Sequence, residues 1–291
     1  MIAIIINSQA RNAEKVKLYL DQFNESNLGF DLYETESKDL TSTIEKCISK
    51  YKIILIGGGD GSIRTAAQYC ANTSIQLGVL PLGTMNHLAK ELNLPQSPEE
   101  LVAVIKNQSV CQVDVGEVNG LIFLNNSSIG FYPKFTIRRI RYGKFYNKWI
   151  SYIPSFIDSL KKHEVFKVDI KSKNLNRSLK TSFLMISNNI YSLKFPLTIK
   201  RDSFKDATLG LYYFKQGKIR LMKILRSLFN NKKNFEILKS EAPIEMYFLE
   251  KDEVSISLDG EVLKVKNPLH YKSRPKSLNL LMNNDENNSN L

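Results

Sequence analysis

The sequence predicts an α/β plus β protein. An N-terminal three-layer α/β domain with a mostly parallel sheet is followed by a C-terminal, mostly antiparallel β-sandwich domain. Short apolar runs alternate with amphipathic stretches over about the first 110 residues, as in a parallel sheet covered by helices on both faces. Strand-like runs then follow one another with few interruptions. The 291 residues, of which 43% are hydrophobic, suffice for two cores.

The first domain is expected over residues 1–120 and opens with a strand. Residues 2–6 are a continuous apolar run, and apolar side chains then recur at helical spacing from Val16 to Phe23. The same order repeats through the domain. The expected strands are 2–6, 30–33, 51–56 and 77–80, and the expected helices are 16–23, 40–50, 62–71 and 86–92.

The second domain is expected over residues 121–282 and is rich in strands. Its clearest strand-like runs are 121–124, 183–187, 209–214 and 254–258. Two basic, helix-like stretches interrupt them, at 134–162 and 218–239. The last element, near 271–282, is a candidate to return to the first domain, and the Asn-rich residues 283–291 are expected to be disordered.

The charge balance favours acidic partners without choosing among them. Lys and Arg number 41 against 29 Asp and Glu, a net charge of +12, which suits nucleic acid, anionic lipid or a phosphorylated substrate. The three cysteines are widely spaced, so we expect neither a disulfide framework nor a zinc site, and a reducing cytoplasm fits best. No run approaches the roughly 18 apolar residues of a membrane-spanning helix. Any membrane contact is therefore expected to be peripheral.

A glycine-rich loop follows the third expected strand. Residues 57–62 read Gly-Gly-Gly-Asp-Gly-Ser, and a bare glycine backbone before a helix lets main-chain amides approach phosphate oxygens. The spacing fits neither the dinucleotide fingerprint nor the Walker loop. The alternative is a tight turn between strand and helix, which would need only one or two glycines.

A second loop, Pro81 to Asn86, follows the next expected strand and also leads into a helix. Loops at the carboxyl ends of adjacent parallel strands face one crevice, the usual ligand position in an open α/β sheet. Helix capping by Thr84 and Asn86 is the alternative interpretation.

An acidic motif, Asp259-Gly260-Glu261, ends an alternating strand near the C-terminus. The pattern alone favours a hairpin turn, because Asp-Gly is a common two-residue turn. An acidic functional site is the alternative.

The glycine loop and the second loop resemble those of the diacylglycerol kinase catalytic-domain family, which includes sphingosine kinases and bacterial lipid kinases. The resemblance lies in residues 58–62 and in residues 81–90, Pro-Leu-Gly-Thr-Met-Asn-His-Leu-Ala-Lys, which show the family's order, spacing and strand context. It covers nearly the whole chain, because Asn7 and Thr35 stand where the family has polar residues after its first and second strands. It implies a nucleotide domain related to NAD kinases and phosphofructokinases, with ATP between that domain and the β-sandwich.

The resemblance also implies roles for individual residues. Asp259 is expected to be the catalytic base, Glu261 its acidic neighbour, and Asp60 a further acid within the glycine loop. Asp206 stands where the family has an aspartate that can bind Mg²⁺, although the glycine and second aspartate of that motif are replaced. The residues expected to bind ATP are Asn7, Thr35, Gly58, Gly59, Asp60, Gly61, Ser62, Gly83, Thr84 and Asn86.

Three further positions depart from the family pattern. Ser62 replaces the usual threonine but keeps the hydroxyl, and His87 replaces an aspartate, as in a bacterial branch of the family. Ser8 replaces the proline after Asn7, which leaves the adenine contacts near residue 8 open.

The implied function is that of an ATP- and Mg²⁺-dependent kinase for a hydroxyl of diacylglycerol or a related membrane lipid. A kinase for a soluble acceptor, as among NAD kinases, and a non-catalytic nucleotide- or lipid-binding protein stay open as alternatives. We expect a cytoplasmic protein held peripherally at the inner, anionic face of the membrane. The basic stretch 134–162 suits that surface or, equally, covers the β-domain, whereas the apolar stripe of residues 218–229 is expected to pack in the core, with membrane docking as the alternative. Without a nucleic-acid motif no nucleic acid is expected. The oligomeric state is open, and a homodimer is one of the alternatives.

Overall fold

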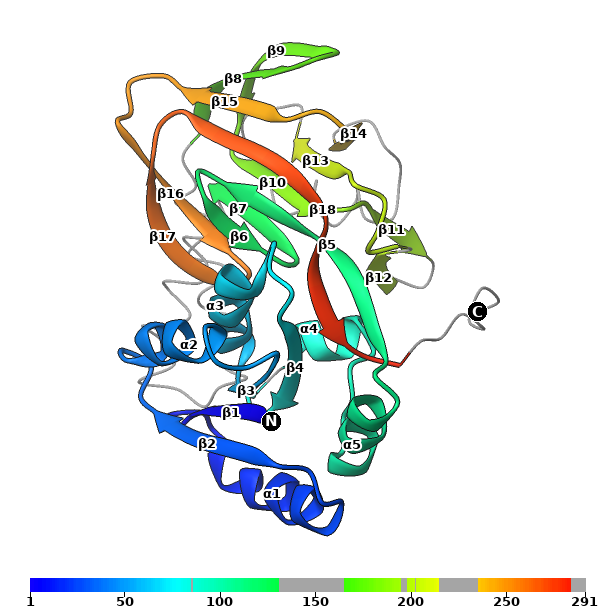
Figure 1. The fold of residues 1–291 in the computed structure, drawn as a ribbon. Helices are drawn as coiled ribbons and strands as arrows, with labels where there is room; N and C mark the ends of the chain where they lie inside the picture. The colour runs from blue at the N-terminus through cyan, green and yellow to red at the C-terminus, as the bar shows by residue number, and fades with distance from the viewer. Residues whose placement is uncertain (85, 131–164, 195–197, 202, 215–234, 284–291) are drawn as a thin grey trace. The chain divides into compact units, whose positions relative to one another are not determined.

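The computed structural model describes residues 1–84, 86–130, 165–194, 198–201, 203–214 and 235–283 (Figure 1). The chain forms two compact units. Unit 1 is Met1–Val115 together with Pro275–Leu291, and unit 2 is Gly116–Arg274. The chain passes from one unit to the other within β5 (Val110–Val118) and returns within β18 (Leu269–Leu281).

Unit 1 contains a parallel sheet in the order β2-β1-β3-β4, and β4 also pairs in parallel with the end of β18. The strands are β1 (Ile2–Asn7), β2 (Phe30–Thr35), β3 (Ile53–Gly58) and β4 (Gln76–Pro81). β1, β3 and β4 are buried almost throughout, as central parallel strands must be. Their continuous apolar runs therefore predicted these three strands correctly.

Helices cover both faces of this sheet. The helices of unit 1 are α1 (Val16–Glu25), α2 (Leu40–Ile48), α3 (Asp60–Cys70), α4 (His87–Glu91) and α5 (Pro98–Lys106), with a 3-10 turn η1 (Ala13–Lys15) before α1. Side chains of α1 and α5 share one core cluster with Ile2, Ile4 and Ile6, while α2 and α3 contact each other and the strands β1 and β3. Alternate residues of β1 thus serve opposite layers, and the predicted three-layer architecture is confirmed.

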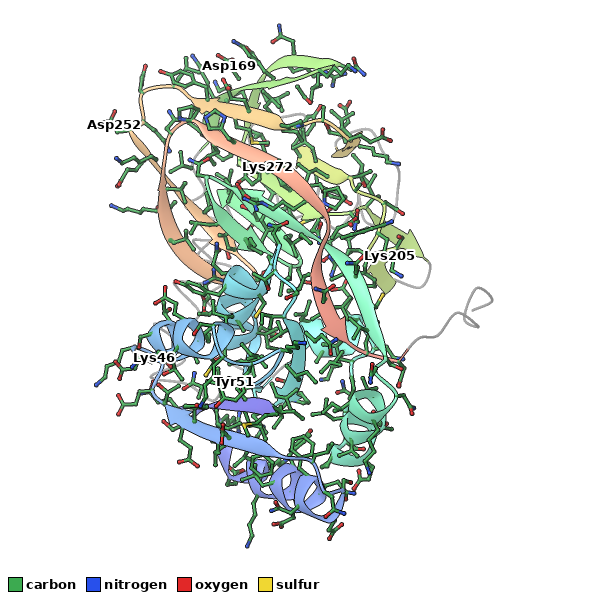
Figure 2. All side chains as sticks on the ribbon, in the orientation of Figure 1. Lys46, Tyr51, Asp169, Lys205, Asp252 and Lys272 are labelled. Atoms are coloured by element: carbon green, nitrogen blue, oxygen red, sulfur yellow. The ribbon has the colours of Figure 1, made fainter. Side chains whose placement is uncertain are left out.

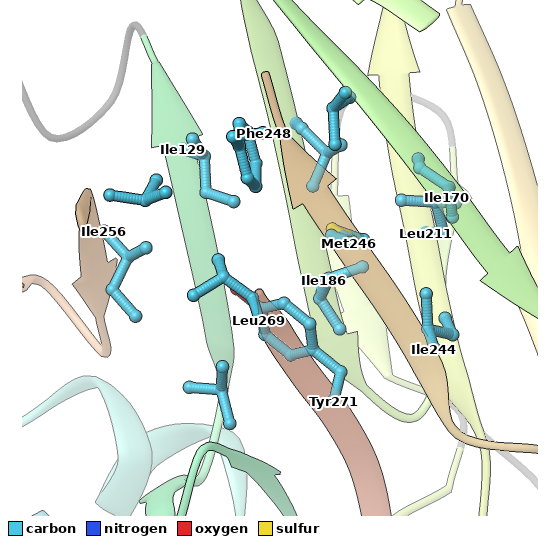
Figure 3. Packing of buried hydrophobic residues seen from close by; sticks show 14 of the residues in the cluster. Ile129, Ile170, Ile186, Leu211, Ile244, Met246, Phe248, Ile256, Leu269 and Tyr271 are labelled. Carbon is cyan, nitrogen blue, oxygen red and sulfur yellow. The ribbon is translucent and has the colours of Figure 1, made fainter. Parts of the chain in front are cut away.

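Unit 2 is a sandwich of antiparallel strands. One sheet has the order β14-β13-β10-β7-β16-β17. Opposite it run β15, β8 and β9 and the first part of β18, which pairs with β15. Inward-facing side chains of both layers form one core cluster, which includes Ile129, Ile186, Met246, Phe248 and Tyr271 (Figure 3). The predicted mostly antiparallel β-sandwich is therefore confirmed.

The strands of unit 2 are short. They are β6 (Leu121–Phe123), β7 (Asn126–Gly130), β8 (Phe166–Ser172), β9 (Leu175–Thr181), β10 (Phe183–Asn188), β11 (Tyr191–Lys194), β12 (Thr198–Arg201), β13 (Leu209–Phe214), β14 (Phe235–Ser240), β15 (Ile244–Phe248), β16 (Glu253–Leu258) and β17 (Glu261–Lys266). β11 and β12 pair only with each other.

One secondary-structure prediction is wrong at its end, and others fall outside the described residues. Residues 235–239, expected within the second basic helix-like stretch, belong to β14, which pairs with β13. The stretch 134–162, the rest of the second stretch up to residue 234, and residues 284–291 of the expected disordered tail lie outside the described residues. Within the described ranges, no helix is both long and apolar enough to cross a membrane.

Burial raises the pKa of several ionisable groups that lie away from the expected site residues, among them Cys70 and Tyr271. In unit 1, burial raises the pKa of the Cys70 thiol, on the last residue of α3, to about 12. In unit 2, burial raises the pKa of Tyr271, and its hydrogen bond with the Ser127 hydroxyl, 2.9 Å long, opposes that shift.

Candidate functional site

The predicted site residues fall into two groups, one in each unit. In unit 1 they follow the carboxyl ends of β1, β2, β3 and β4, the edge at which open α/β sheets bind ligands. In unit 2 they lie at the turn after β16 and in the loop before β13. Each group is described by itself.

Asn7, the last residue of β1, links the loop after β2 to the glycine loop. Its Nδ2 donates to the Ser62 hydroxyl at 3.0 Å and to the Ser37 hydroxyl at 3.1 Å. Asn7 and Ser62 are only 8% and 7% exposed, so the hydrogen bond between them satisfies polar groups that are buried away from water. Thr35 ends β2 and is also buried, and its carbonyl accepts from the main-chain N–H of Ser8 at 2.9 Å. The structure therefore brings Asn7 and Ser62 together and places Thr35 beside Ser8, at the start of the loop that follows β1.

The glycine loop packs against the second loop without side chains between them. A Cβ added to Gly83 would lie 2.5 Å from Cα of Gly59 and 2.6 Å from Oδ1 of Asn86, and one on Gly58 would lie 2.5 Å from the Ser62 hydroxyl. Only glycine permits so close an approach. Because the Gly83 and Gly59 backbones meet, the two loops can present main-chain amides to a phosphate group, with the N-terminus of α3 directly following Gly59.

Asp60 links the two loops through its carboxylate. Its two oxygens accept the main-chain N–H groups of His87, at 3.3 Å, and Leu88, at 3.2 Å, at the start of α4. Helix α3, which begins at Asp60 itself, has no side-chain cap at its N-cap residue Gly59. A carboxylate at a helix N-terminus satisfies amides that lack an intrahelical partner. Asp60 thereby holds α4 close to the glycine loop.

Asn86 stands at the N-cap position of α4 but does not cap it with its side chain. Its backbone is left-handed, with φ of 49°, and its Nδ2 donates to the Pro81 carbonyl at 2.8 Å. Its Oδ1 is buried and accepts no hydrogen bond in the described part of the chain. The capping alternative is wrong for Asn86. Thr84, in the same loop, is exposed.

Sequence reasoning missed Asn12. Its Nδ2 donates to the Gly83 carbonyl at 3.0 Å, and its main-chain N–H donates to the Leu82 carbonyl at 3.1 Å. Asn12 thus joins the loop after β1 to the second loop. A lone asparagine outside any motif gave no signal for this contact, which spans 71 residues of sequence.

In unit 2, Asp259 and Gly260 form the two-residue turn between β16 and β17, with φ of 48° and 94°. Positive φ at both positions is typical of a tight hairpin turn, so the hairpin interpretation is confirmed. The Asp259 carboxylate, however, also binds the connection between β6 and β7. Its Oδ2 accepts the N–H of Leu124 at 2.7 Å, and its Oδ1 accepts those of Asn125 at 2.8 Å and Asn126 at 3.0 Å.

Glu261 and Asp206 lie near the surface of unit 2. Glu261 is the first residue of β17, pairs with Leu258 and is exposed. Asp206 is exposed in the loop before β13, next to Lys205, which Figure 2 labels. The Asp206 carboxylate is of the oxygen-donor type that Mg²⁺ prefers. Among the residues that the structure describes, no three His, Cys, Asp or Glu side chains gather into a metal-binding group.

Comparisons with known proteins point to one family. Residues 1–118 match the model of the diacylglycerol kinase catalytic domain. A Pseudomonas aeruginosa protein named "Probable lipid kinase YegS-like" is 36% identical over 104 residues, which are 35% of this chain and 34% of that protein. A Serratia proteamaculans protein of the same name is 27% identical over 274 residues, or 90% of this chain and 87% of that protein.

The fold has close structural relatives. A crystal structure of a Bacillus anthracis str. Sterne protein assigned as a diacylglycerol kinase superposes with a TM-score of 0.75 at 23% identity and covers 97% of both chains. The domain match and the names of the relatives indicate an enzyme of the kinase class, and the chain folds into a glycine-loop α/β unit and a β-sandwich unit. Residues 1–118 are thus similar to the diacylglycerol kinase catalytic domain, which confirms the resemblance drawn from the sequence.

Proposed function

We propose that this protein is a lipid kinase that transfers the γ-phosphate of Mg²⁺-ATP to a hydroxyl group of diacylglycerol or a related membrane lipid. The family and the names of the relatives support the reaction class. The observation that carries the proposal is the Asp259 carboxylate, which three main-chain amides hold in one orientation. A turn residue alone needs no such fixation, whereas a base for phosphoryl transfer depends on positioning.

In this proposal the two units have different tasks. The loops of unit 1 bind the triphosphate through the bare main chain of Gly58, Gly59 and Gly83, and Mg²⁺ offsets the phosphate charge when bound. Asp259 of unit 2 accepts the proton of the acceptor hydroxyl, whose oxygen bonds to the γ-phosphorus while the bond to the β–γ bridging oxygen breaks. ADP and a phosphorylated lipid result.

Phosphate transfer from radiolabelled ATP tests this reaction. We expect label in diacylglycerol micelles and none in soluble polyols or NAD, whereas label in a soluble acceptor would favour the alternative kinase. No transfer to any acceptor despite ATP binding would indicate a non-catalytic binding protein.

Flotation with anionic and with zwitterionic vesicles tests the proposed peripheral membrane contact, which the net charge of +12 supports.

The decisive variant is Asp259→Asn. Removing a general base costs about 10²- to 10⁴-fold in kcat, and we expect a loss in that range with ATP affinity retained. Asn keeps one acceptor oxygen for three amides, so unit 2 also loses about 1–3 kcal/mol of stability. Asp252→Asn is the matched control, because Asp252 is an exposed aspartate of the same unit (Figure 2). Wild-type turnover in Asp259→Asn would remove this residue from the mechanism.

A further inference from the structure

Arg201 is a buried arginine at the end of β12. Its side chain is 1% exposed. The guanidinium carbon lies 4.5 Å from the ring centroid of Phe204 and 5.4 Å from that of Tyr191, within the range of cation–π attraction. Burying a cation is costly unless its donors are satisfied. The hydrogen bonds of the guanidinium are therefore needed to hold this side chain in the interior.

The guanidinium binds the same connection that Asp259 binds. Nη1 donates to the Leu124 carbonyl at 2.7 Å and to the Asn188 carbonyl at 3.0 Å, and Nη2 donates to Oδ1 of Asn125 at 2.7 Å. The planar, forked donor set of arginine can reach all three oxygens in a fixed geometry, which lysine cannot do. Arg201 therefore fixes the residues between β6 and β7 from their carbonyl and side-chain oxygens.

One peptide group is shared by the two charged side chains. The carbonyl of Leu124 and the N–H of Asn125 belong to the same peptide unit. Its oxygen accepts from Arg201, while its N–H donates to Asp259 Oδ1 at 2.8 Å. Nδ2 of Asn188 also donates to the Leu124 carbonyl oxygen, at 3.2 Å. A cation at the carbonyl polarises the peptide and strengthens its N–H as a donor to the carboxylate.

We propose that Arg201 is a positioning residue for Asp259, acting through the peptide between Leu124 and Asn125. It fixes the orientation of that peptide and stabilises the negative charge of the carboxylate, without contact with the lipid or the nucleotide. The inference rests on the proposed role of Asp259 as base.

The neighbourhood of Asp259 makes this effect measurable. Residues 124–130, which include the amides that Asp259 binds, carry no ionisable side chain, and Glu261 lies two residues after Asp259. Arg201 reaches the peptide whose N–H donates to Asp259. Loss of the guanidinium removes a favourable interaction with the charged carboxylate, so the pKa of Asp259 should rise. The acidic limb of the pH–kcat profile should then move to higher pH.

The test compares Arg201→Met and Arg201→Lys with the control Arg177→Met. Arg177 is an arginine of the same unit that binds the Tyr213 hydroxyl and Glu236 at 2.9 and 2.8 Å. In Arg201→Met we expect kcat to fall by about 10- to 100-fold at unchanged KM for ATP, and the acidic limb of the pH–kcat profile to move to higher pH. Arg201→Lys should recover part of kcat. Arg177→Met should leave kcat and the position of the acidic limb unchanged.

Two outcomes would overturn the inference while leaving the proposed function in place. One is a wild-type kcat and pH profile in Arg201→Met. The other is a fall of kcat in proportion to the folded fraction, without a shift of the acidic limb, which would give Arg201 a merely structural role.

A second measurement does not depend on activity. We expect the amide hydrogen of Asn125 to exchange about tenfold faster in Arg201→Met, and amides of unit 1 to be unaffected. If the wild-type protein transfers no phosphate, the proposed function fails by that result alone. The exchange data then decide the coupling separately, and unchanged exchange at Asn125 overturns it.

Discussion

The two groups of candidate site residues, one in each unit, are built by opposite means. In unit 1 the glycine loop and the second loop meet because side chains are absent, with Gly83 against Gly59. In unit 2 a charged side chain, Asp259, gathers main-chain amides around itself. The group in unit 1 should therefore be sensitive to added atoms, and the group in unit 2 to the removal of charge.

The sharpest test of this contrast is a pair of glycine substitutions in unit 1. In Gly83→Ala the new Cβ meets backbone at 2.5 Å, whereas in Gly59→Ala its nearest neighbour is at 3.6 Å. We expect Gly83→Ala to lose about 1–3 kcal/mol of stability and Gly59→Ala to lose little. ATP affinity, measured by calorimetry, should fall in both if the bare backbone binds phosphate. Equal urea midpoints for the two variants would refute the steric account.

Alkaline pH should weaken unit 1 through Cys70. The folded pKa of Cys70, about 12, lies above its ordinary value of 9.0 because of burial. The thiol therefore supports folding fully below pH 9, and this support is lost as pH rises from 9 towards 12. We expect wild type to lose up to about 1.4 kcal/mol per pH unit in that window relative to Cys70→Ala. Urea unfolding at pH 8 and pH 10 measures this, and parallel stability curves would contradict it.

Asp60 tests whether charge also matters within unit 1. Asp60→Ala removes the acceptors of two amides of α4, so we expect a loss of about 1 kcal/mol. Asp60→Asn keeps an acceptor oxygen and should retain most of that stability. Thermal unfolding compares the two. If both variants lose the same amount, the negative charge rather than the hydrogen bonds holds α4.

The smallest expected effect is at Ser62. In Ser62→Ala, Asn7 loses one acceptor and keeps the Ser37 hydroxyl, so we expect a loss of about 0.5–1.5 kcal/mol. Ser62→Thr restores a hydroxyl and is the matched control. Chemical denaturation of the three proteins measures the difference, and a more stable Ser62→Ala would show that the buried bond contributes nothing.

The sequence predicted the parts of unit 1 that depend on local pattern. β1, β3 and β4 are continuous apolar runs because central parallel strands are buried on both faces. Helix α5 was not among the predicted elements, although it carries a local signal: Ser97 accepts the N–H of Glu100, and Pro98 stands in the first turn.

Long-range contacts could not be predicted from pattern. Residues 235–240 form a strand because β13 pairs with them, and nothing in their composition separates them from the basic stretch before. Likewise, Arg201 meets Leu124 across 77 residues, and Asp259 meets Asn125 across 134 residues. The Asp-Gly-Glu motif indicated a turn and a carboxylate, but only folding shows what the carboxylate holds.

The return of β18 to unit 1 has a consequence for biosynthesis. Asn279 and Leu280 pair with β4, and Leu281 is buried in the cluster that contains Ile4 and Leu55. A ribosome makes these residues after every strand of unit 2. The nascent chain can therefore complete the β-sandwich of unit 2 before the parallel sheet of unit 1. Until residues 279–281 are made, the edge of β4 that pairs with β18 has no strand partner, and chaperones can bind it.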